Sequence, residues 1–286
     1  MIVVTGASGQ LGQLVISELL RKMTPQKIVA VVRDSSKVKT LSDIGINVRI
    51  ADYNNPASLD AAFLGAKKIL LISSNDIGNR LEQHRAVIFA AKKVKTLELF
   101  AYTSILKSNA TSMKLAGEHI ATEKIIQENN LPAVILRNGW YSENYLDQLK
   151  GALESGTFFG SAKEGIISAA SRADYAEAAA MALTKENQAG KIYELAGDQA
   201  FTLFELANIA SEVTGKKITY LDLPENDYAK ALVEIGLPES YANIFADSDV
   251  GISRGDLFTD KNDLSTLINR KTTLIELTIK ENLGNA

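Results

Sequence analysis

Residues 1–12 read MIVVTGASGQLG, a short β-branched run followed by glycines at positions 6, 9 and 12. The run predicts a buried strand, and the apolar spacing after it predicts an amphipathic helix. In such a unit the first glycine permits a tight turn, the second lets backbone N–H groups approach a pyrophosphate, and the third lets helix and strand lie close together. The pattern predicts a dinucleotide site at the helix N-terminus. The alternative is a glycine-rich turn that holds no ligand.

The same rhythm of short strand and longer amphipathic segment repeats through the first half of the chain. The strand-like runs are IVVT (2–5), KIVAVV (27–32), NVRIAD (47–52), KKILLIS (67–73), LELFAYT (97–103) and AVILRN (133–138). Runs as apolar as these are typical of parallel strands that are covered on both faces. We therefore expect an α/β fold with a Rossmann-type doubly wound parallel sheet, and ligands at the carboxyl ends of its strands.

After Asn138 the rhythm loosens, which predicts a second, smaller α/β lobe at the C-terminal side that covers the substrate. We expect an NAD(P)-binding Rossmann core over residues 1–140, to which segments around 166–200 return, and a lobe formed mainly by 141–286. Within FTLFELANIASEVTG (201–215), Thr202 is the expected helix N-cap and Gly215 the expected terminator.

Composition excludes several kinds of chemistry. The 286 residues include no cysteine, so disulfides, a thiol nucleophile and thiolate metal ligands are all excluded. With only His84 and His119, the chain is a poor candidate for a metal site. The net charge of −3 and the scattered lysines argue against nucleic acid as a partner. No basic leader is visible, and no apolar run approaches the roughly 18 residues of a membrane span, so we expect a soluble cytoplasmic protein without membrane contact.

Arg33, in VVRDSSK, stands at the end of the second predicted strand, where an adenosine-binding fold needs a group for the ribose. An acidic residue would accept a hydrogen bond from a free 2′-hydroxyl, whereas arginine pairs with a 2′-phosphate. We therefore expect NADPH as the preferred cofactor, with weaker use of NADH. Asp34 follows directly and Lys37 is close, which leaves room for incomplete discrimination. Arg33 could instead be a solvated charge at a strand end.

The segment TGAxGxxG, with a strand before it and a helix after it, resembles the short-chain dehydrogenase/reductase superfamily. Most members carry YxxxK after the fifth strand, where tyrosine passes a proton to the carbonyl substrate. Alignment on LPAVILRN (131–138) places Leu115 and His119 at these two positions, so the dyad is absent. Thr103 or Ser104 stands where the superfamily keeps its serine. Asp52 and Tyr53 stand where it contacts adenine, although Asp52 could equally form a turn ahead of Pro56.

Two interpretations follow from the missing dyad. In the first, the protein is an enzyme that delivers hydride to a quinone or a cationic dye, whose reduced form needs no strong enzyme acid. In the second, the protein has lost its chemistry and senses the redox state of the nucleotide. In either case His119 could hold the ribose or the nicotinamide amide, or it could be a packed helix histidine.

Several longer segments resemble the NmrA-like atypical short-chain dehydrogenase/reductases. They are TGASGQLG (5–12), GEHIATEK (117–124), LRNGWYSENY (136–145), YELAGDQAFTL (193–203) and FADSDVGISRGDLF (245–258). The resemblance covers nearly the whole chain, and it is strongest to the bacterial type 2 NAD(P)H:quinone oxidoreductases, with triphenylmethane dye reductases next. It implies a flavin-free reductase that passes hydride from NADPH to a small quinone-like substrate. We also expect no bound metal, and a monomer or homodimer.

The resemblance also assigns site residues. The pyrophosphate would be contacted by Gly6, Ala7, Ser8, Gly9, Gln10 and Leu11, the 2′-phosphate by Arg33, and the nicotinamide side by Ser73, Ser74, Asn75, Asn138, Gly139, Trp140, Tyr141, Ser142 and Glu143. Arg172 is also assigned to the cofactor site, at a family position near the substrate side, although SR before AD could equally be an ordinary helix entry. No proton donor is identified; His119 and Tyr141 are the candidates. Trp140, with Tyr141 and Tyr145, offers planar surface suited to stacking a flat acceptor, or to joining the two lobes.

Overall fold

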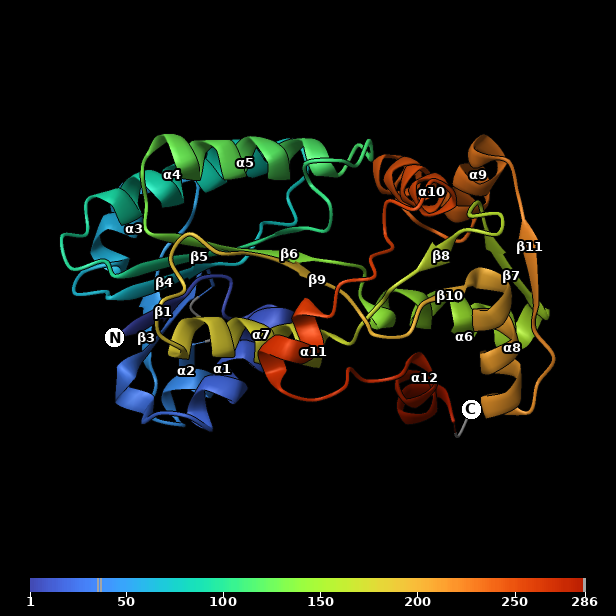
Figure 1. Cartoon of the computed structure of the whole chain (residues 1–286), viewed down its shortest axis with the longest axis horizontal. Coiled ribbons are helices and arrows are strands. Elements are labelled where there is room, and N and C mark those ends of the chain that lie inside the picture. Colours follow the sequence, from blue (N-terminus) through green and yellow to red (C-terminus); the bar gives the residue numbers. More distant parts are fainter. Residues whose placement is uncertain (35, 37, 285–286) are drawn as a thin grey trace. The chain divides into compact units, whose positions relative to one another are not determined.

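The computed structural model of the chain describes residues 1–34, 36 and 38–284. The chain forms two compact units, each discontinuous in sequence (Figure 1). Unit 1 contains Met1–Ile105, Glu118–Asn138 and Arg172–Tyr193. Unit 2 contains Leu106–Gly117, Gly139–Ser171 and Glu194–Ala286.

The central feature of unit 1 is a seven-stranded sheet with the strand order β3-β2-β1-β4-β5-β6-β9, of which the last strand begins in unit 1 and ends with residues assigned to unit 2. Its strands are β1 (Ile2–Val4), β2 (Ile28–Val32), β3 (Asn47–Ile50), β4 (Lys68–Leu71), β5 (Leu99–Ile105), β6 (Ala133–Asn138) and β9 (Ile192–Leu195). The pairs from β3 to β6 are all parallel; for example, Val4 pairs with Ala30 on one side and with Leu70 on the other. Each predicted run therefore contains a strand, and the predicted parallel α/β sheet is confirmed.

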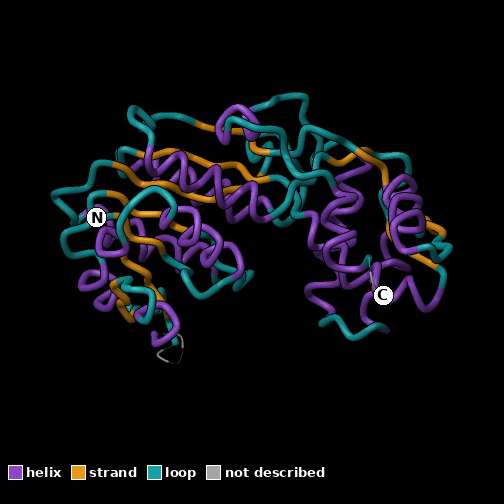
Figure 2. The backbone as a smooth tube through the Cα atoms, turned by 90° about the horizontal axis from the view of Figure 1, so that it is seen from below, coloured by secondary structure: helices purple, strands orange, loops and turns teal. Residues whose placement is uncertain are grey.

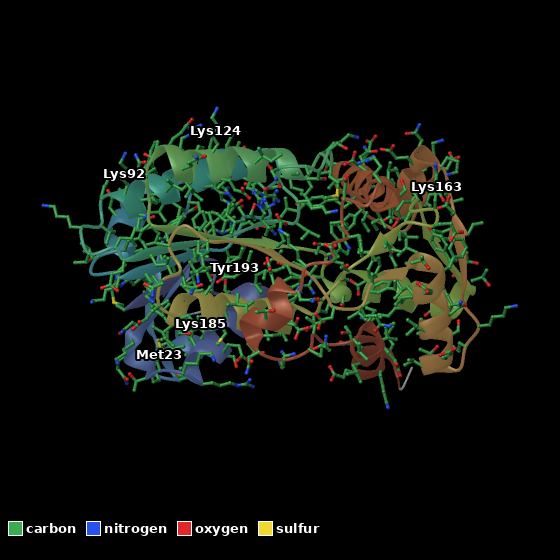
Figure 3. The ribbon with its side chains drawn as sticks, in the orientation of Figure 1. Met23, Lys92, Lys124, Lys163, Lys185 and Tyr193 are labelled. Atoms are coloured by element: carbon green, nitrogen blue, oxygen red, sulfur yellow. The ribbon has the colours of Figure 1, made fainter. Side chains whose placement is uncertain are left out.

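Helices cover both faces of this sheet (Figures 1 and 2). The connections are α1 (Gln10–Leu20), the 3-10 helix η1 (Pro25–Lys27), α2 (Val38–Ser42), α3 (Pro56–Ala62), α4 (Arg80–Lys92), α5 (Ala116–Glu128) and α7 (Arg172–Thr184). β2 and β5 are buried along their whole length, as expected of strands between two helical layers. The core under α3 to α5 includes Phe63, Phe100 and Tyr102. Figure 3 shows Lys92 and Lys124 pointing outward from α4 and α5.

The strand order reverses at β1, which lies between β2 and β4. In open parallel sheets, ligands bind beyond the carboxyl ends of the strands at such a reversal, because the connections leave in opposite directions and open a crevice. The loops after β1, β2 and β4 therefore carry the candidate site.

Unit 2 contains two small sheets and several helices. The pairs are β7 (Thr157–Gly160) parallel to β11 (Thr219–Asp222), and β8 (Ile166–Ile167) antiparallel to β10 (Phe201–Thr202). The helices are η3 (Ser142–Tyr145), α6 (Leu146–Ser155), α8 (Leu203–Thr214), α9 (Glu225–Glu234), α10 (Glu239–Ser253), α11 (Asp263–Ile268) and α12 (Ile275–Leu283). Both predicted ends of α8 are confirmed, because Thr202 forms a capping box with Glu205 and Gly215 ends the helix with φ of 70°.

Candidate functional site

The loop between β1 and α1 has the geometry of an anion-binding turn. Gly6 has φ of 61°, in the left-handed region that favours glycine. A Cβ atom on Gly12 would lie 2.3 Å from the Gly6 carbonyl oxygen, so glycine is needed for α1 to approach the turn. Gly9, the N-cap of α1, supplies no capping side chain, and the first turn contains no acidic residue. The first-turn N–H groups are therefore left for an anion such as a pyrophosphate.

The other residues of this loop divide into buried anchors and open positions. Ala7 is fully buried, and its N–H donates to the Val31 carbonyl at 3.2 Å, which ties the loop to β2. Leu11 is also in the core, so these two side chains anchor the loop. Ser8 is half-buried, with its carbonyl oxygen held by the Gln13 amide at 2.7 Å, and Gln10 is exposed.

Arg33 and Asp34 follow β2, and their surroundings differ. Arg33 is exposed and forms no hydrogen bond or ion pair with the described residues. The Asp34 carboxylate accepts the Ser36 N–H at 2.8 Å and the Ser36 hydroxyl at 2.6 Å, so it is engaged in a local turn. Lys37 lies outside the described residues. Arg33 is therefore an exposed cation at this strand end, the position at which a 2′-phosphate would be bound.

Asp52 and Tyr53, after β3, both have local partners. The Asp52 carboxylate accepts the Asn54 N–H at 2.9 Å, which is the turn chemistry considered as its alternative role. The Tyr53 hydroxyl donates to Thr5 Oγ1 at 2.6 Å, and burial raises the pKa of Tyr53 to about 12. Tyr53 thereby connects the loop after β3 to the end of β1.

The loop after β4 is held by α4. The Ser74 N–H donates to His84 Nε2 at 2.9 Å, and the Ser74 hydroxyl donates to Gln83 Oε1 at 2.5 Å. Ser73 is half-buried and Asn75 is exposed, on either side of this anchored residue. The loop thus lies fixed at the carboxyl end of β4, beside the glycine turn after β1.

The two positions that correspond to the missing dyad contain no proton-transfer pair. Leu115 immediately precedes α5, and His119 lies in its first turns, 5% exposed. Its Nδ1 lies 2.7 Å from the Tyr102 hydroxyl and its Nε2 lies 3.4 Å from Arg80 Nη1. Burial, together with the Arg80 charge, holds the pKa of His119 well below its usual range. His119 is therefore an uncharged, internally hydrogen-bonded residue, as in the packed alternative.

The two hydroxyls at the serine position of the superfamily are also engaged. Thr103 Oγ1 accepts the Ser73 N–H at 2.9 Å. The Ser104 hydroxyl donates to Glu123 Oε1 at 2.5 Å, and Glu123 also pairs with Arg137 at 2.7 Å. These side chains connect β5, α5 and β6, which gives both hydroxyls structural partners within unit 1.

Asn138, the last residue of β6, has an unmet hydrogen-bonding capacity. Its side chain is 5% exposed, and its Oδ1 atom has no hydrogen-bond partner among the described residues. A buried acceptor without a partner is rare in folded proteins and calls for a ligand or water. A dinucleotide at the carboxyl end of the sheet could supply that donor from its ribose or carboxamide.

Unit 1 therefore brings most of the expected cofactor residues to one edge of the sheet. They are Gly6, Ala7, Ser8, Gly9, Gln10, Leu11, Arg33, Ser73, Ser74, Asn75 and Asn138, after β1, β2, β4 and β6. Arg172 is the first residue of α7, also in unit 1.

The remaining expected residues, Gly139 to Glu143, belong to unit 2. Tyr141 forms a parallel bridge with Ala170, and the Ser142 N–H donates to the Ala170 carbonyl at 2.9 Å. Trp140 is half-buried and meets the Phe245 ring edge to face at 6.0 Å. Tyr145 is different: it is 4% exposed and packs against Phe158 and Phe201, so its ring belongs to the core of unit 2.

Metal-binding clusters and membrane-spanning helices are both absent from the described part of the chain. Among residues 1–34, 36 and 38–284, no group of three or more histidine, cysteine or acidic side chains is arranged to hold a metal ion. In the same described part of the chain, no helix is long and apolar enough to cross a membrane.

Comparison with known protein families shows to which family the chain belongs. The profile of the NmrA-like family matches residues 1–269. The chain belongs to the NmrA-like family. This membership confirms the resemblance found in the sequence, and it agrees with the glycine turn, the strand order and the absent YxxxK dyad.

Among NmrA-like proteins, quinone oxidoreductase 2 of Escherichia coli is 48% identical over 275 residues, which are 96% of each chain. A solved E. coli structure, an NADPH-dependent quinone oxidoreductase in complex with NADPH, superposes with a TM-score of 0.96 at 47% identity, covering 98% of this chain and 99% of that one. The triphenylmethane reductase of Citrobacter sp., solved with NADP(H), has a TM-score of 0.95 at 38% identity, covering 99% and 100%. NmrA, a negative transcriptional regulator, is 14% identical with a TM-score of 0.80 over 99% and 95% of the two chains, a likeness of fold alone.

The sequence analysis did not identify the buried polar side chains that hydrogen-bond to the loop after β4. Arg80, Gln83 and His84 lie on the buried face of α4, with Tyr102 beyond them on β5. A signal was present, because RLEQH (80–84) places three polar residues at helical spacing where an apolar face is expected.

Proposed function

We propose that this chain is an NADPH-dependent quinone oxidoreductase, which reduces a small quinone to the hydroquinone without flavin. The observation that carries the proposal is the 48% identity to quinone oxidoreductase 2 over 96% of both chains. The superposition on the NADPH complex of such an enzyme extends this likeness to the fold of nearly the whole chain.

The residues of unit 1 fit the cofactor. The uncapped N-terminus of α1 suits the pyrophosphate, the exposed Arg33 guanidinium suits the 2′-phosphate, and the unpartnered Asn138 Oδ1 suits a donor near the nicotinamide end. When bound, NADPH supplies a hydride from its nicotinamide ring.

The protein's own contribution is to bind NADPH and the quinone and to orient them toward each other. Reduction of a quinone adds one hydride and one proton, and the hydroquinone that forms is electronically stable, so no strong enzyme acid is required. His119 is buried and uncharged, with both ring nitrogens facing internal partners, which argues against its use as the donor. We assign the proton to water, with Tyr141 as the remaining side-chain candidate.

In this proposal Trp140 and Tyr141 supply the surface for the acceptor. Trp140 and Tyr141 are only half-buried, and both follow a strand end in the loop that the family places near nicotinamide. Tyr145 is left out of this role because its ring is enclosed by core aromatics. Stacking on planar aromatic side chains suits a flat quinone.

The test is a turnover assay with purified protein, NADPH and a small benzoquinone, without added flavin. We would follow the loss of nicotinamide absorbance and the formation of hydroquinone in equal amounts, subtract the uncatalysed rate and repeat the assay with NADH. Saturable turnover that prefers NADPH is the expected result. Binding of NADPH without turnover of any quinone or dye would contradict the enzyme and favour the nucleotide sensor.

A second acceptor class has a specific observation in its favour. The Citrobacter triphenylmethane reductase is 38% identical across 99% of this chain, so triphenylmethane dyes belong in the same assay. The two classes share the reductase chemistry and differ in the acceptor. We expect the quinone to give the higher kcat/KM, and a higher value for the dye would reverse the assignment. The nucleotide-sensor alternative has weaker support, since the transcriptional regulator NmrA shares only the fold with this chain.

The remaining features of the proposal concern assembly and location. A cytoplasmic location, a monomeric or homodimeric state, and the lack of a nucleic-acid partner stay predictions from the sequence. Size-exclusion chromatography with light scattering, in the presence and absence of NADPH, would determine the assembly.

A further inference from the structure

Ser74, in the loop after β4, is held by three side chains of one helix. Its N–H donates to His84 Nε2 at 2.9 Å, its carbonyl accepts Arg80 Nε at 2.6 Å, and its hydroxyl donates to Gln83 Oε1 at 2.5 Å. Arg80, Gln83 and His84 are 5%, 4% and 0% exposed. Their spacing places all three on the same face of α4. Every hydrogen-bonding group of Ser74 therefore meets a buried side chain.

The protonation state of His84 follows from its partners. Because Nε2 accepts a backbone N–H, the ring proton resides on Nδ1, which donates to Thr122 Oγ1 at 3.0 Å. The Thr122 hydroxyl in turn donates to the Glu118 carbonyl at 2.7 Å. Burial, reinforced by the Arg80 charge, lowers the pKa of His84 to about 3, so the ring stays neutral near neutral pH. His84 Nε2 therefore remains available near neutral pH to accept the Ser74 N–H.

Arg80 is held from its other side by α5. Its Nη1 lies 3.6 Å from Glu118 Oε2 and 3.4 Å from His119 Nε2. The other Glu118 carboxylate oxygen accepts the Gly78 N–H at 3.2 Å, at the far end of the same loop. The loop is therefore fixed at Ser74 and at Gly78 by a connected set of buried or half-buried polar side chains from α4 and α5.

A buried polar cluster is a poor way to gain stability, because apolar side chains of equal volume usually stabilise as well or better. Its advantage is a defined geometry for the groups to which it bonds. All three α4 side chains bond the same residue, and Ser73 and Asn75, which we assign to the nicotinamide side of the cofactor, are its neighbours in the chain. A displacement of Ser74 would therefore also displace Ser73 and Asn75.

We propose that Arg80, Gln83 and His84 are positioning residues that fix the Ser73–Asn75 loop for the nicotinamide half of NADPH. This inference rests on the cofactor assignment of the proposed function, and it adds three residues behind the loop that do not touch the ligand themselves. We assign the adenosine half of the cofactor to other loops, after β1 and β2. Loss of a positioning residue should therefore affect the two halves of the cofactor unequally.

The test compares the dissociation constants of NADPH and of adenosine 2′,5′-bisphosphate, which lacks nicotinamide. His84→Leu should weaken NADPH by about tenfold, equivalent to about 1.4 kcal/mol, and change the bisphosphate by less than about twofold. His84→Gln retains an acceptor at a similar reach and should restore most of the NADPH affinity. Arg85→Ala is the matched control, because Arg85 neighbours His84 on α4 but has a side chain 41% exposed.

Parallel weakening of both ligands, or no weakening of either, would overturn the inference. If His84→Leu fails to fold, Gln83→Met supplies the same comparison, because it removes the acceptor of the Ser74 hydroxyl at nearly constant volume. If wild-type protein binds NADPH but reduces no quinone, the proposed reductase activity is wrong, but the binding test of the positioning residues still applies. Wild-type protein that binds no NADPH would overturn both.

Discussion

The Tyr102 hydroxyl lies 2.7 Å from Nδ1 of His119, at the helix position where most short-chain dehydrogenase/reductases carry the lysine of their dyad. Both residues are buried, and Arg80 lies at the opposite ring nitrogen. Because an arginine N–H only donates, Nε2 is the acceptor and Nδ1 carries the proton. Polar contacts here join β5, α5 and α4, and they leave no ring nitrogen directed at a substrate.

We predict that His119→Gln lowers stability and leaves chemistry intact. The melting temperature should fall by several degrees, because a buried polar contact worth about 1 kcal/mol is disturbed. Turnover per folded molecule, measured with NADPH and benzoquinone, should stay within about twofold of wild type. Ile120→Ala, at the exposed next position of α5, is the control for helix content. A large loss of kcat at unchanged stability would make His119 catalytic.

Two glycine substitutions should act in opposite directions. Gly12→Ala would place Cβ 2.3 Å from the Gly6 carbonyl oxygen and should destabilise by about 1–3 kcal/mol and weaken NADPH binding. Gly117→Ala, in the first turn of α5, would place no Cβ within 4 Å of any atom beyond its neighbours and its own helix backbone, and should stabilise by up to about 0.5–1 kcal/mol, since alanine favours a helix. Denaturant unfolding of both variants measures the two effects. Equal behaviour of the pair would refute the close approach of α1 to the turn.

Arg33 should determine the preference for NADPH over NADH. Arg33→Asp removes a charge-assisted contact with the 2′-phosphate and should raise the dissociation constant of NADPH by about 10- to 100-fold, with little change for NADH. Isothermal titration with both nucleotides gives the ratio. Lys22→Asp, an exposed position just after α1, makes the same change in net charge elsewhere. Equal loss for both nucleotides would remove the assignment.

Asp249, on α10, should make stability depend on pH. Burial is the main cause that raises its pKa from 3.8 to about 7, and nearby Asp222 adds to the shift, although the Ser161 N–H opposes it with a hydrogen bond at 2.9 Å. The folded carboxyl keeps its proton up to about pH 7, whereas the unfolded one loses it near pH 4. The free energy of unfolding therefore decreases as pH rises from about 4 to 7, by up to about 4 kcal/mol.

The substitution Asp249→Asn isolates this effect, because asparagine retains an oxygen acceptor for Ser161 and has no proton to lose. The difference in free energy of unfolding between the variant and the wild type should increase as pH rises from about 4 to 7. The variant should remain the more stable protein at pH 8. Chemical unfolding at half-unit steps between pH 4 and 8 measures the difference. A difference that does not vary with pH would exclude an Asp249 pKa near 7.

Much of the fold could be read from the sequence because local signals agreed with the tertiary arrangement. The apolar runs from IVVT to AVILRN became strands, since a parallel sheet covered on both faces requires nearly continuous hydrophobicity. Thr202 and Gly215 delimit α8 as predicted, because capping uses only neighbouring backbone groups. The TGASGQLG turn and the absent YxxxK dyad indicated the family for the same reason: both are short patterns of fixed spacing.

Other features depended on contacts that no local pattern encodes. Tyr145 looked like an acceptor-stacking residue by its place in LRNGWYSENY, but its ring is enclosed by Phe158 and Phe201, which are distant in sequence. The polar face of α4 gained its meaning only from Ser74 and from α5. Sequence alone determined the order of the strands along the chain, the dinucleotide turn and the charge of Arg33. Only the tertiary structure decided which polar side chains are buried together, because burial and hydrogen-bond partners arise from segments far apart in the chain.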